Sequence, residues 1–379
     1  MVAPGFLAIG SGPAGVSAAE TFRSKHPDIP VRILTADPAL PYAKSPLSKD
    51  FLCDRETKLN LHSERWFRDN RVDLMRGITV RRIDLDRREV VTAGGNRYPY
   101  WHLLIASGST AVRPDIPGIE AALTLRSFAD AVALKMAAHY SDCAVVIGGG
   151  LIGCEAASCL AELGVATMVV AAEHVPLQRR FGVEAGERVA KILSDNGVRF
   201  AGETSVAAIE DSNVLLDSGE SVEADLVVCA TGVRPDIRLA EAAGLTTRDG
   251  RIVTDERMHT SAQNVYAAGD VALAENVAAG RPIPAEHWRD AAYQGYVVGL
   301  AAAGYPAAWD VVPGYSCTIG GLVLKYRGWG LGHETSRIVD HHNGFTVTYE
   351  AHGDVVGVLT LNADDDHRRA DQLLRNRSR

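Results

Sequence analysis

The sequence contains Gly10-Ser11-Gly12-Pro13-Ala14-Gly15 and, further along, Gly148-Gly149-Gly150-Leu151-Ile152-Gly153. Each stretch follows a short apolar run, at 6–9 and 144–147, and opens a segment of small residues. This is the strand, turn and helix context of a dinucleotide-binding loop, in which the first glycine permits a tight turn, the second lets bare backbone approach a pyrophosphate and the third allows close helix–strand contact. The phosphates then lie on unpaired amides at a helix N-terminus. Two such loops predict two dinucleotides, with electrons passing from one to the other.

Composition indicates a globular protein of more than one domain. The chain has 379 residues, of which 46% are hydrophobic and 23% are charged, and this length exceeds that of one ordinary core. The formal net charge of -8 counts against generic nucleic-acid binding. No stretch reaches the ~18 apolar residues of a membrane span, and the N-terminal residues lack the pattern of a signal peptide. We therefore expect a cytoplasmic protein that binds neither nucleic acid nor membrane.

The cysteines form no CxxC pair and show no zinc-type spacing; they are Cys53, Cys143, Cys154, Cys159, Cys229 and Cys317. This scatter fits a reducing compartment and buried thiols. On a helix, Cys154 and Cys159 diverge by about 140°, so they are not expected to pair. No metal site is expected.

Each loop begins the same succession of helix, strand and hairpin. In the first half we expect a helix, a strand and a hairpin turn at 13–25, 31–34 and 94–96. The second half repeats this plan, with a helix, a strand, a second helix and a hairpin turn at 151–163, 167–170, 184–196 and 217–219. The chain is therefore interpreted as an α/β protein with two Rossmann-like dinucleotide-binding domains. Short strands broken by Asn343-Gly344 and Gly353-Asp354 predict a small α+β domain at the C-terminus.

Five ordered blocks carry a family resemblance. The most diagnostic is Pro41-Tyr42-Ala43-Lys44-Ser45-Pro46-Leu47-Ser48-Lys49. The other four are Leu125-Arg126-Ser127 with Asp130, Ala230-Thr231-Gly232-Val233-Arg234-Pro235, Val265-Tyr266-Ala267-Ala268-Gly269-Asp270, and Glu286-His287-Trp288 with Gln294-Gly295. Over about residues 5–310 the sequence resembles the two-dinucleotide flavoproteins, in particular the putidaredoxin reductase-like ferredoxin and rubredoxin reductases that serve oxygenases. The first block is similar to that family's PYxRPPLSK segment.

The resemblance implies FAD on the first loop and NADH or NADPH on the second. It implies an FAD-binding domain of 1–109 and 232–308, an NAD(P)H-binding domain of 110–231 and a C-terminal domain of 309–379. The residues implied for FAD are Gly10, Gly12, Gly15, Lys44, Lys49, Val80, Arg126, Gly269, Asp270, His287 and Trp288. Those implied for NAD(P)H are Gly148, Gly150, Ile152, Gly153, Glu155 and Gly232.

The resemblance assigns the catalytic roles to Lys49 and Glu155. Lys49 matches a lysine near the flavin N5 edge, where a cation stabilises the negative charge of the reduced flavin. Glu155 matches a glutamate that faces the nicotinamide and can pair with that lysine. Asp270 is implied to bind a ribityl hydroxyl, with Gly269 allowing the backbone to approach. Lys44 stands where the family usually has arginine, so it keeps the charge without the bidentate fork.

The sequence departs from this pattern where an acidic residue should bind a ribose. In the first half the family glutamate aligns with Ala36, and the next residue, Asp37, is either its substitute or a turn former before Pro38. In the second half Ala171 occupies the position. Without a carboxylate there, Arg179 and Arg180 could reach a 2′-phosphate, so both NADH and NADPH stay open. The family's terminal WSD segment aligns with Ser316-Cys317-Thr318.

Three functions are compatible with these residues. The first is a reductase that takes hydride from NAD(P)H onto FAD and passes single electrons to a small iron–sulfur protein, either a ferredoxin or a rubredoxin. The second is a disulfide, peroxide or oxygen reductase, which needs a cysteine at the flavin; Cys53 is the nearest in sequence. The third is a redox-switch flavoprotein resembling apoptosis-inducing factor. The oligomeric state, monomer or homodimer, is not determined by the sequence.

Overall fold

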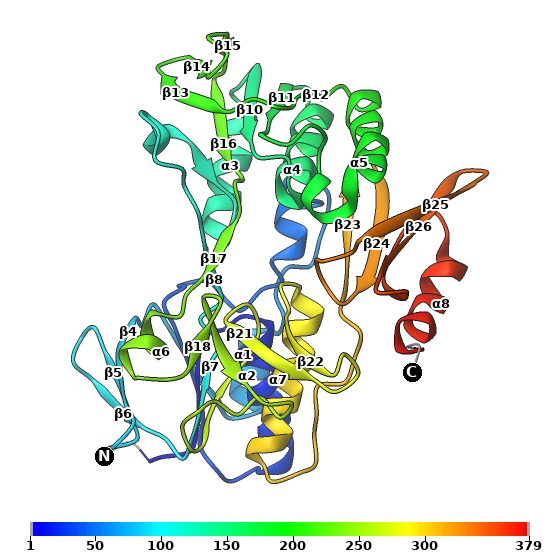
Figure 1. The fold of residues 1–379 in the computed structure, drawn as a ribbon. Coiled ribbons are helices and arrows are strands. Elements are labelled where there is room, and N and C mark those ends of the chain that lie inside the picture. Colours follow the sequence, from blue (N-terminus) through cyan, green and yellow to red (C-terminus); the bar gives the residue numbers. More distant parts are fainter. Residues whose placement is uncertain (1–2, 377–379) are drawn as a thin grey trace. The chain divides into compact units, whose positions relative to one another are not determined.

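The computed structural model describes residues 3–376, which divide into two compact units (Figure 1). The first unit takes in Met1–Ala43, Leu59–Thr110 and Arg234–Gly314. The second takes in Lys44–Lys58, Ala111–Val233 and Tyr315–Arg379. The chain therefore passes between the units five times, and the segment 44–58 belongs to the second unit although both of its neighbours belong to the first. The expected division into three domains stays a prediction.

Five parallel strands form the central sheet of the first unit. They are β1 (Phe6–Ile9), β2 (Val31–Thr35), β3 (Val72–Arg76), β7 (His102–Ile105) and β20 (Val265–Ala267). Their order in the sheet is β20-β7-β1-β2-β3, with Phe6 opposite both Val31 and His102. All four residues of β1 are buried, as expected for the centre of a parallel sheet. This doubly wound order confirms the expected fold class and puts the first glycine-rich loop at the carboxyl end of β1.

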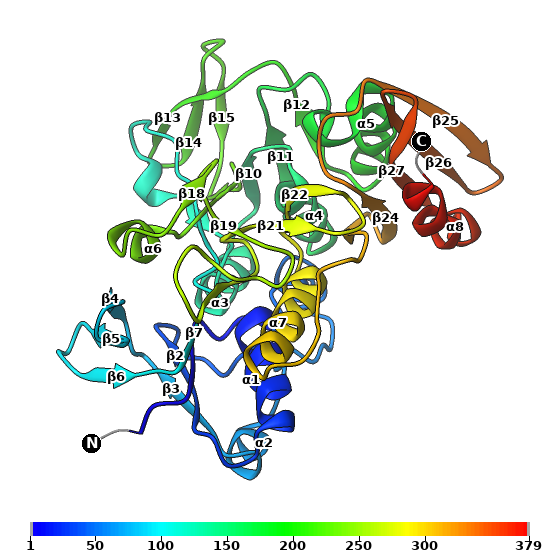
Figure 2. The same cartoon turned by 60° about the horizontal axis from the view of Figure 1, so that its bottom comes forward.

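Two helices of this unit, α1 (Pro13–Lys25) and α7 (Trp288–Ala302), lie side by side (Figures 1 and 2). Glycines on α7 allow their close approach. A Cβ atom added at Gly295 would lie 2.2 Å from the carbonyl oxygen of Ala14, and one at Gly299 would lie 2.5 Å from Cβ of Thr21. The spacing of the two glycines puts both on one face of α7.

The remaining elements of the first unit are short. The helices are α2 (Glu64–Asp69) and α6 (Arg238–Ala242). One antiparallel sheet contains β4 (Val80–Asp84), β5 (Glu89–Thr92) and β6 (Arg97–Pro99). Another sheet has the order β18-β19-β21-β22, with bounds Thr247–Arg248, Arg251–Thr254, Ala272–Asn276 and Arg281–Pro284. The pair β8 (Ser109–Ala111) and β17 (Val233–Pro235) contains two of the points at which the chain leaves one unit for the other.

The second unit repeats the parallel sheet. Its strands are β9 (Leu123–Thr124), β10 (Cys143–Ile147), β11 (Ala166–Val170), β12 (Arg199–Ala201) and β16 (Leu226–Cys229), in the order β12-β11-β10-β16-β9. Its helices are α3 (Phe128–Ala138), α4 (Leu151–Glu162) and α5 (Gln178–Asp195), and its 3-10 turns are η1 (Ser45–Ser48) and η2 (Ile119–Ala121). A three-stranded antiparallel sheet consists of β13 (Val206–Glu210), β14 (Asn213–Leu216) and β15 (Ser221–Glu223). The second glycine-rich loop joins β10 to α4, as the sequence predicts.

The C-terminal residues form an antiparallel sheet with a final helix. The strands are β23 (Gly314–Ile319), β24 (Leu322–Gly328), β25 (Thr335–His341), β26 (Gly344–Ala351) and β27 (Asp354–Leu361), in the order β23-β24-β27-β26-β25. Helix α8 (Asp364–Arg375) packs on β24 and β27 (Figure 2). The Trp329 indole donates to the carbonyl of Leu374 in this helix. The turns predicted at Asn343-Gly344 and Gly353-Asp354 fall between strands, as expected.

The expectation of unpaired thiols is wrong for two of the cysteines. Cys53 and Cys159 form a disulfide, with their Cα atoms 5.0 Å apart, whereas Cys143, Cys154, Cys229 and Cys317 are free. The two bonded cysteines are 106 residues apart. No spacing rule reports such a pair, because only the packing of segment 44–58 on α4 brings them together. None of the helices within residues 3–376 combines the length and apolar character needed to cross a membrane.

Candidate functional site

The first glycine-rich loop is shaped by two of its glycines and left open at the third. Gly10 has φ +107°, and a Cβ there would lie 2.1 Å from the carbonyl oxygen of Ala106. A Cβ at Gly15 would lie 2.0 Å from the carbonyl oxygen of Gly10. At Gly12, by contrast, an added Cβ would meet no protein atom within 4 Å, and no side chain caps the helix that begins there. Bare backbone with uncapped amides facing open space fits a pyrophosphate.

The second loop has the same geometry. Gly148 has φ +112°, and a Cβ there would lie 2.5 Å from the carbonyl oxygen of Ala230. A Cβ at Gly153 would lie 2.0 Å from the carbonyl oxygen of Gly148. A Cβ at Gly150 would meet nothing within 4 Å, and α4 begins without a side-chain cap. Each unit therefore contains one loop that fits the phosphates of a dinucleotide.

Part of the predicted FAD set lies with the first loop in the first unit. Gly269 lies against the start of α1, since its added Cβ would be 3.6 Å from Cβ of Ala14, and its amide donates to Gln294 Oε1 at 2.8 Å. The carboxylate of Asp270 accepts a hydrogen bond from the Ser109 hydroxyl, and its backbone carbonyl accepts one from Arg251. The structure thus brings Gly269 beside the first loop. The assignment of these residues to FAD stays a prediction.

Two aromatic candidates lie at the start of α7. His287 is the residue that precedes the helix, and its ring centroid is 5.7 Å from that of Trp288. Trp288 is 42% exposed, so it is not an ordinary core aromatic. Val80, the first residue of β4, is half-buried. Their contact with FAD stays a prediction.

Asp37 holds its own loop together. Its Oδ1 accepts from the amide of Ala39 at 2.9 Å, and its Oδ2 accepts from the Tyr42 hydroxyl at 2.8 Å. Of the two alternatives left by the sequence, these contacts favour the turn former. A carboxylate has further lone pairs, and the ribose role of Asp37 stays a prediction.

The other FAD candidates lie in the second unit, on segment 44–58 and at the start of α3. Lys44 Nζ donates to the carbonyl of Arg126 at 3.1 Å. Arg126 directly precedes a capping box, in which the Ser127 hydroxyl accepts from the amide of Asp130 and the Asp130 carboxylate accepts from the amide of Ser127. The block Leu125-Arg126-Ser127 with Asp130 is therefore a helix N-terminus that fixes the position of Arg126.

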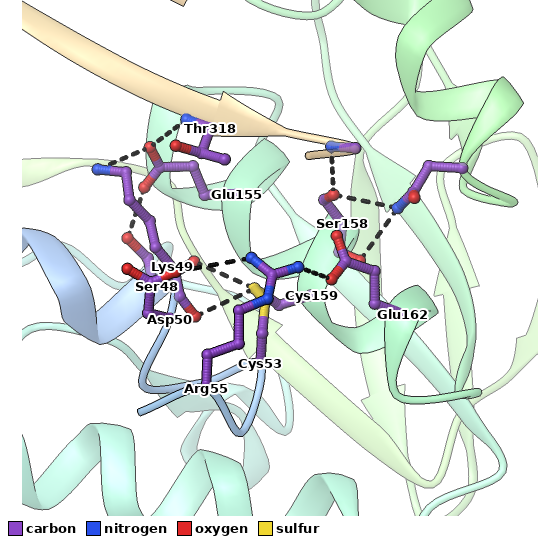
Figure 3. The surroundings of a disulfide bond; sticks show 12 residues. Ser48, Lys49, Asp50, Cys53, Arg55, Glu155, Ser158, Cys159, Glu162 and Thr318 are labelled. Carbon is purple, nitrogen blue, oxygen red and sulfur yellow. Dashed lines mark hydrogen bonds and ion pairs between the residues drawn. A yellow bond between two sulfur atoms is a disulfide. The ribbon is translucent and has the colours of Figure 1, made fainter. Parts of the chain in front are cut away.

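Lys49, which follows η1, forms an ion pair with Glu155 on α4 (Figure 3). Lys49 Nζ lies 3.1 Å from Glu155 Oε1, and the side chains are 14% and 5% exposed. The Ser48 hydroxyl donates to Glu155 Oε2 at 2.5 Å, and the amide of Thr318 donates to Oε1 at 3.1 Å. Because both charges are largely removed from water, their attraction is stronger than that of a surface pair. The structure brings the two predicted catalytic residues together.

The ammonium of Lys49 has further partners at the same place. It donates to Ser45 Oγ at 2.9 Å and to the carbonyl of Ser316 at 3.5 Å. The segment Ser316-Cys317-Thr318 thus contributes to the pair through its backbone. Sequence reasoning missed Ser48 and Thr318 as partners of Glu155. Both lie in quoted blocks, but no pattern says where their polar groups point.

The two thiols beside the ion pair, Cys154 and Cys317, are buried, and burial disfavours their thiolate form. Burial raises the pKa of the Cys317 thiol well above its usual range, and the negative charge of Glu155 raises it further. Burial raises the pKa of Cys154 in the same way, with Glu155 as a second cause. Since the thiolate is the reactive form, these shifts disfavour a nucleophilic role for either thiol.

The predicted 2′-phosphate ligands are placed differently from each other. Arg179 is exposed. Arg180 is half-buried, donates to the Tyr315 hydroxyl at 3.1 Å and lies over the Tyr315 ring at 5.2 Å.

Gly232 is exposed with φ +121°, and its carbonyl accepts from the amide of Val112. Ile152, in the first turn of α4, is half-buried. All four roles at NAD(P)H stay predictions.

Comparison with known proteins agrees with this geometry. The sequence profile of the family described as pyridine nucleotide-disulphide oxidoreductase matches residues 6–295. The rubredoxin-NAD(+) reductase of Pseudomonas putida is 31% identical over 351 residues, covering 90% of each chain. The anthranilate 1,2-dioxygenase system ferredoxin--NAD(+) reductase component of Burkholderia cepacia is 30% identical over 391 residues, covering 99% of this chain and 95% of its own. The crystal structure of the covalent putidaredoxin reductase-putidaredoxin complex superposes with a TM-score of 0.93 at 25% identity, covering 99% of this chain and 93% of that one.

Proposed function

The chain belongs to the pyridine nucleotide-disulphide oxidoreductase family, and from this premise we propose that it is an FAD-dependent NAD(P)H:ferredoxin or rubredoxin reductase. Bound FAD supplies the chemistry, since it accepts two electrons as hydride and releases them one at a time. The acceptor is a small iron–sulfur protein of an oxygenase system. We place the protein in the cytoplasm, as a monomer or homodimer without nucleic-acid or membrane partners.

One observation carries the proposal: Lys49 forms a buried ion pair with Glu155, which lies on α4, the helix that begins at the second open loop. The Ser48 hydroxyl and the Thr318 amide donate to the Glu155 carboxylate, and the carboxylate holds the ammonium of Lys49 in one position. A fixed cation in a site shielded from water stabilises negative charge that develops next to it, without the reorganisation that water would require. Glu155 orients that cation through the 3.1 Å contact.

We further propose NADH as the donor. Arg180 is already engaged by the hydroxyl and ring of Tyr315, so binding a 2′-phosphate would require it to leave that contact. Arg179 is exposed, so holding a phosphate would cost the conformational entropy of ordering a long surface side chain. The relatives compared above carry NAD(+) in their names, in agreement with this choice.

An anaerobic titration tests the function. The purified protein should be yellow, and heat should release FAD rather than FMN. Stoichiometric NADH should bleach the flavin, and an added ferredoxin or rubredoxin should restore its colour while becoming reduced. A protein that no flavin reconstitutes contradicts the proposal. Rapid turnover with peroxide or a disulfide, but not with the iron–sulfur protein, would favour the second function. A long-lived reduced complex without turnover would favour the redox switch.

A further inference from the structure

Segment 44–58, which we call the Lys49 segment, is attached to the rest of the second unit by a covalent bond as well as by packing (Figure 3). Leu47 and Leu52 anchor it, being 2% and 0% exposed. The Cys53–Cys159 disulfide then joins it to the same helix that carries Glu155. The amide of Cys53 donates to the carbonyl of Lys49 at 2.9 Å. The bond is therefore one backbone hydrogen bond away from the catalytic lysine.

The remaining attachments beyond Cys53 are weaker because they face water. Arg55 pairs with Glu162, with side chains 45% and 26% exposed. Asp54 pairs with Lys135, with side chains 39% and 26% exposed. Ion pairs as accessible as these are screened by solvent and salt and contribute little. The disulfide is thus the main attachment of the part of the segment that follows Leu52.

We propose that Cys53 and Cys159 form a thiol–disulfide exchange site, at which a dithiol reductant releases from α4 the part of the Lys49 segment that follows Leu52. The two sulfurs are not equivalent. Cys53 is half-buried, whereas Cys159 is 4% exposed. An incoming thiolate can therefore attack Cys53 and not Cys159.

The exchange is balanced in two steps. The first thiolate of the reductant bonds to Cys53 Sγ while the bond to Cys159 breaks, and Cys159 leaves as a thiolate that takes up a proton. The second thiol of the reductant then displaces Cys53, which is protonated in turn. Two electrons and two protons pass from the dithiol to the protein, and the reductant becomes a disulfide. Re-oxidation by a small disulfide reverses both steps.

Release of this part loosens the backbone support of Lys49, because the amide of Cys53 donates to the carbonyl of Lys49. The oxidised protein holds the lysine in place, and the reduced protein does so less firmly. The consequence for hydride transfer rests on the proposed function, but the opening of the segment does not. The two can therefore be tested separately.

The test is limited trypsin digestion of the purified protein with its flavin, with and without prior treatment by dithiothreitol. Alkylation and peptide mapping should find Cys53 and Cys159 blocked before treatment and modified after it. Cleavage after Arg55 or Lys58 should become severalfold faster on reduction, since proteolysis follows the population of the opened segment. Re-oxidation should restore the slow rate.

Two variants complete the design. Trypsin should cleave the Cys53→Ser variant, without any reductant, as fast as it cleaves the reduced wild-type protein. Cys143→Ser, which removes a free half-buried cysteine of the same unit, should behave as wild type. Free Cys53 and Cys159 in the untreated protein would overturn the inference, and so would a cleavage rate that reduction leaves unchanged. Failure of NADH to reduce the flavin in the same preparation would count against the proposed function and leave the digestion result standing.

Discussion

Replacing Lys49 with methionine removes the charge and keeps most of the aliphatic stem. Over the 3.1 Å to Glu155, with an effective dielectric constant of about 20, the attraction lost is about 5 kcal/mol. Breaking a buried pair at one partner costs about 3–5 kcal/mol, because the other charge stays buried. The Ser48 hydroxyl and the Thr318 amide still donate to Glu155, but neither group carries a charge that offsets that of the carboxylate. For a unit of about 200 residues, this loss lowers Tm by about 6–20 °C.

Calorimetry of the single variants Lys49→Met and Glu155→Gln, and of the double variant, measures this coupling. The double variant should melt above the temperature expected from additivity, with a coupling of about 0.5–3 kcal/mol, because it leaves no unpaired carboxylate. Lys191→Met is the matched control. Its pair with Asp195 is 75% and 64% exposed, so it should change stability by less than about 0.5 kcal/mol.

Stopped-flow measurement of the same variants gives the rate of flavin reduction by NADH. Lys49→Met should lower this rate while FAD stays bound. Additive effects on Tm, or a Lys49→Met variant as stable as the Lys191→Met control, would show that the buried pair does not form in solution. Unchanged hydride kinetics would reject the role of Lys49.

Three further predictions concern the loops, the nucleotide and the thiols. Gly12→Ala should lower the affinity for FAD without changing the Tm of the apo-protein, because the added Cβ meets no atom within 4 Å. Gly15→Ala should lower the free energy of unfolding by about 1–3 kcal/mol, because its Cβ would lie 2.0 Å from the Gly10 carbonyl oxygen. Equal Tm values for the two variants would contradict this. Replacing Arg179 and Arg180 with alanine should leave KM for NADH nearly unchanged, and Arg180→Ala should lower Tm through loss of the Tyr315 contact; a selective loss of NADPH turnover would instead assign them to a 2′-phosphate. Burial raises the pKa of Cys154 and Cys317, so their thiolate fraction is low below the raised pKa. Iodoacetamide at about pH 8 should therefore modify neither thiol until guanidinium unfolds the protein. Rapid labelling of the native protein would show that these thiols are accessible.

Local patterns were sufficient for the helices next to the loops. The helix predicted at 13–25 is α1, and the helix predicted at 151–163 ends one residue earlier. The helix predicted at 184–196 is the part of α5 that follows a kink at Gly182, and α5 has one additional turn before the kink, from Gln178. Its first turn is interrupted at Gly182, which has φ +80°, and is held by Phe181, whose carbonyl accepts from the Tyr349 hydroxyl. That contact comes from a strand far along the chain, so no local pattern could report it.

The sequence by itself determined the two nucleotide loops and the family, because a turn that needs bare backbone constrains residue type within a few neighbouring positions. It also named Lys49 and Glu155, but only through resemblance. Tertiary structure alone decided that Ser48 and Thr318 support Glu155, and that Cys53 meets Cys159 across 106 residues. The physical reason is the same in both cases. Such contacts depend on which surfaces of distant segments pack together, and hydrogen bonds and disulfides form wherever that packing brings suitable atoms within reach.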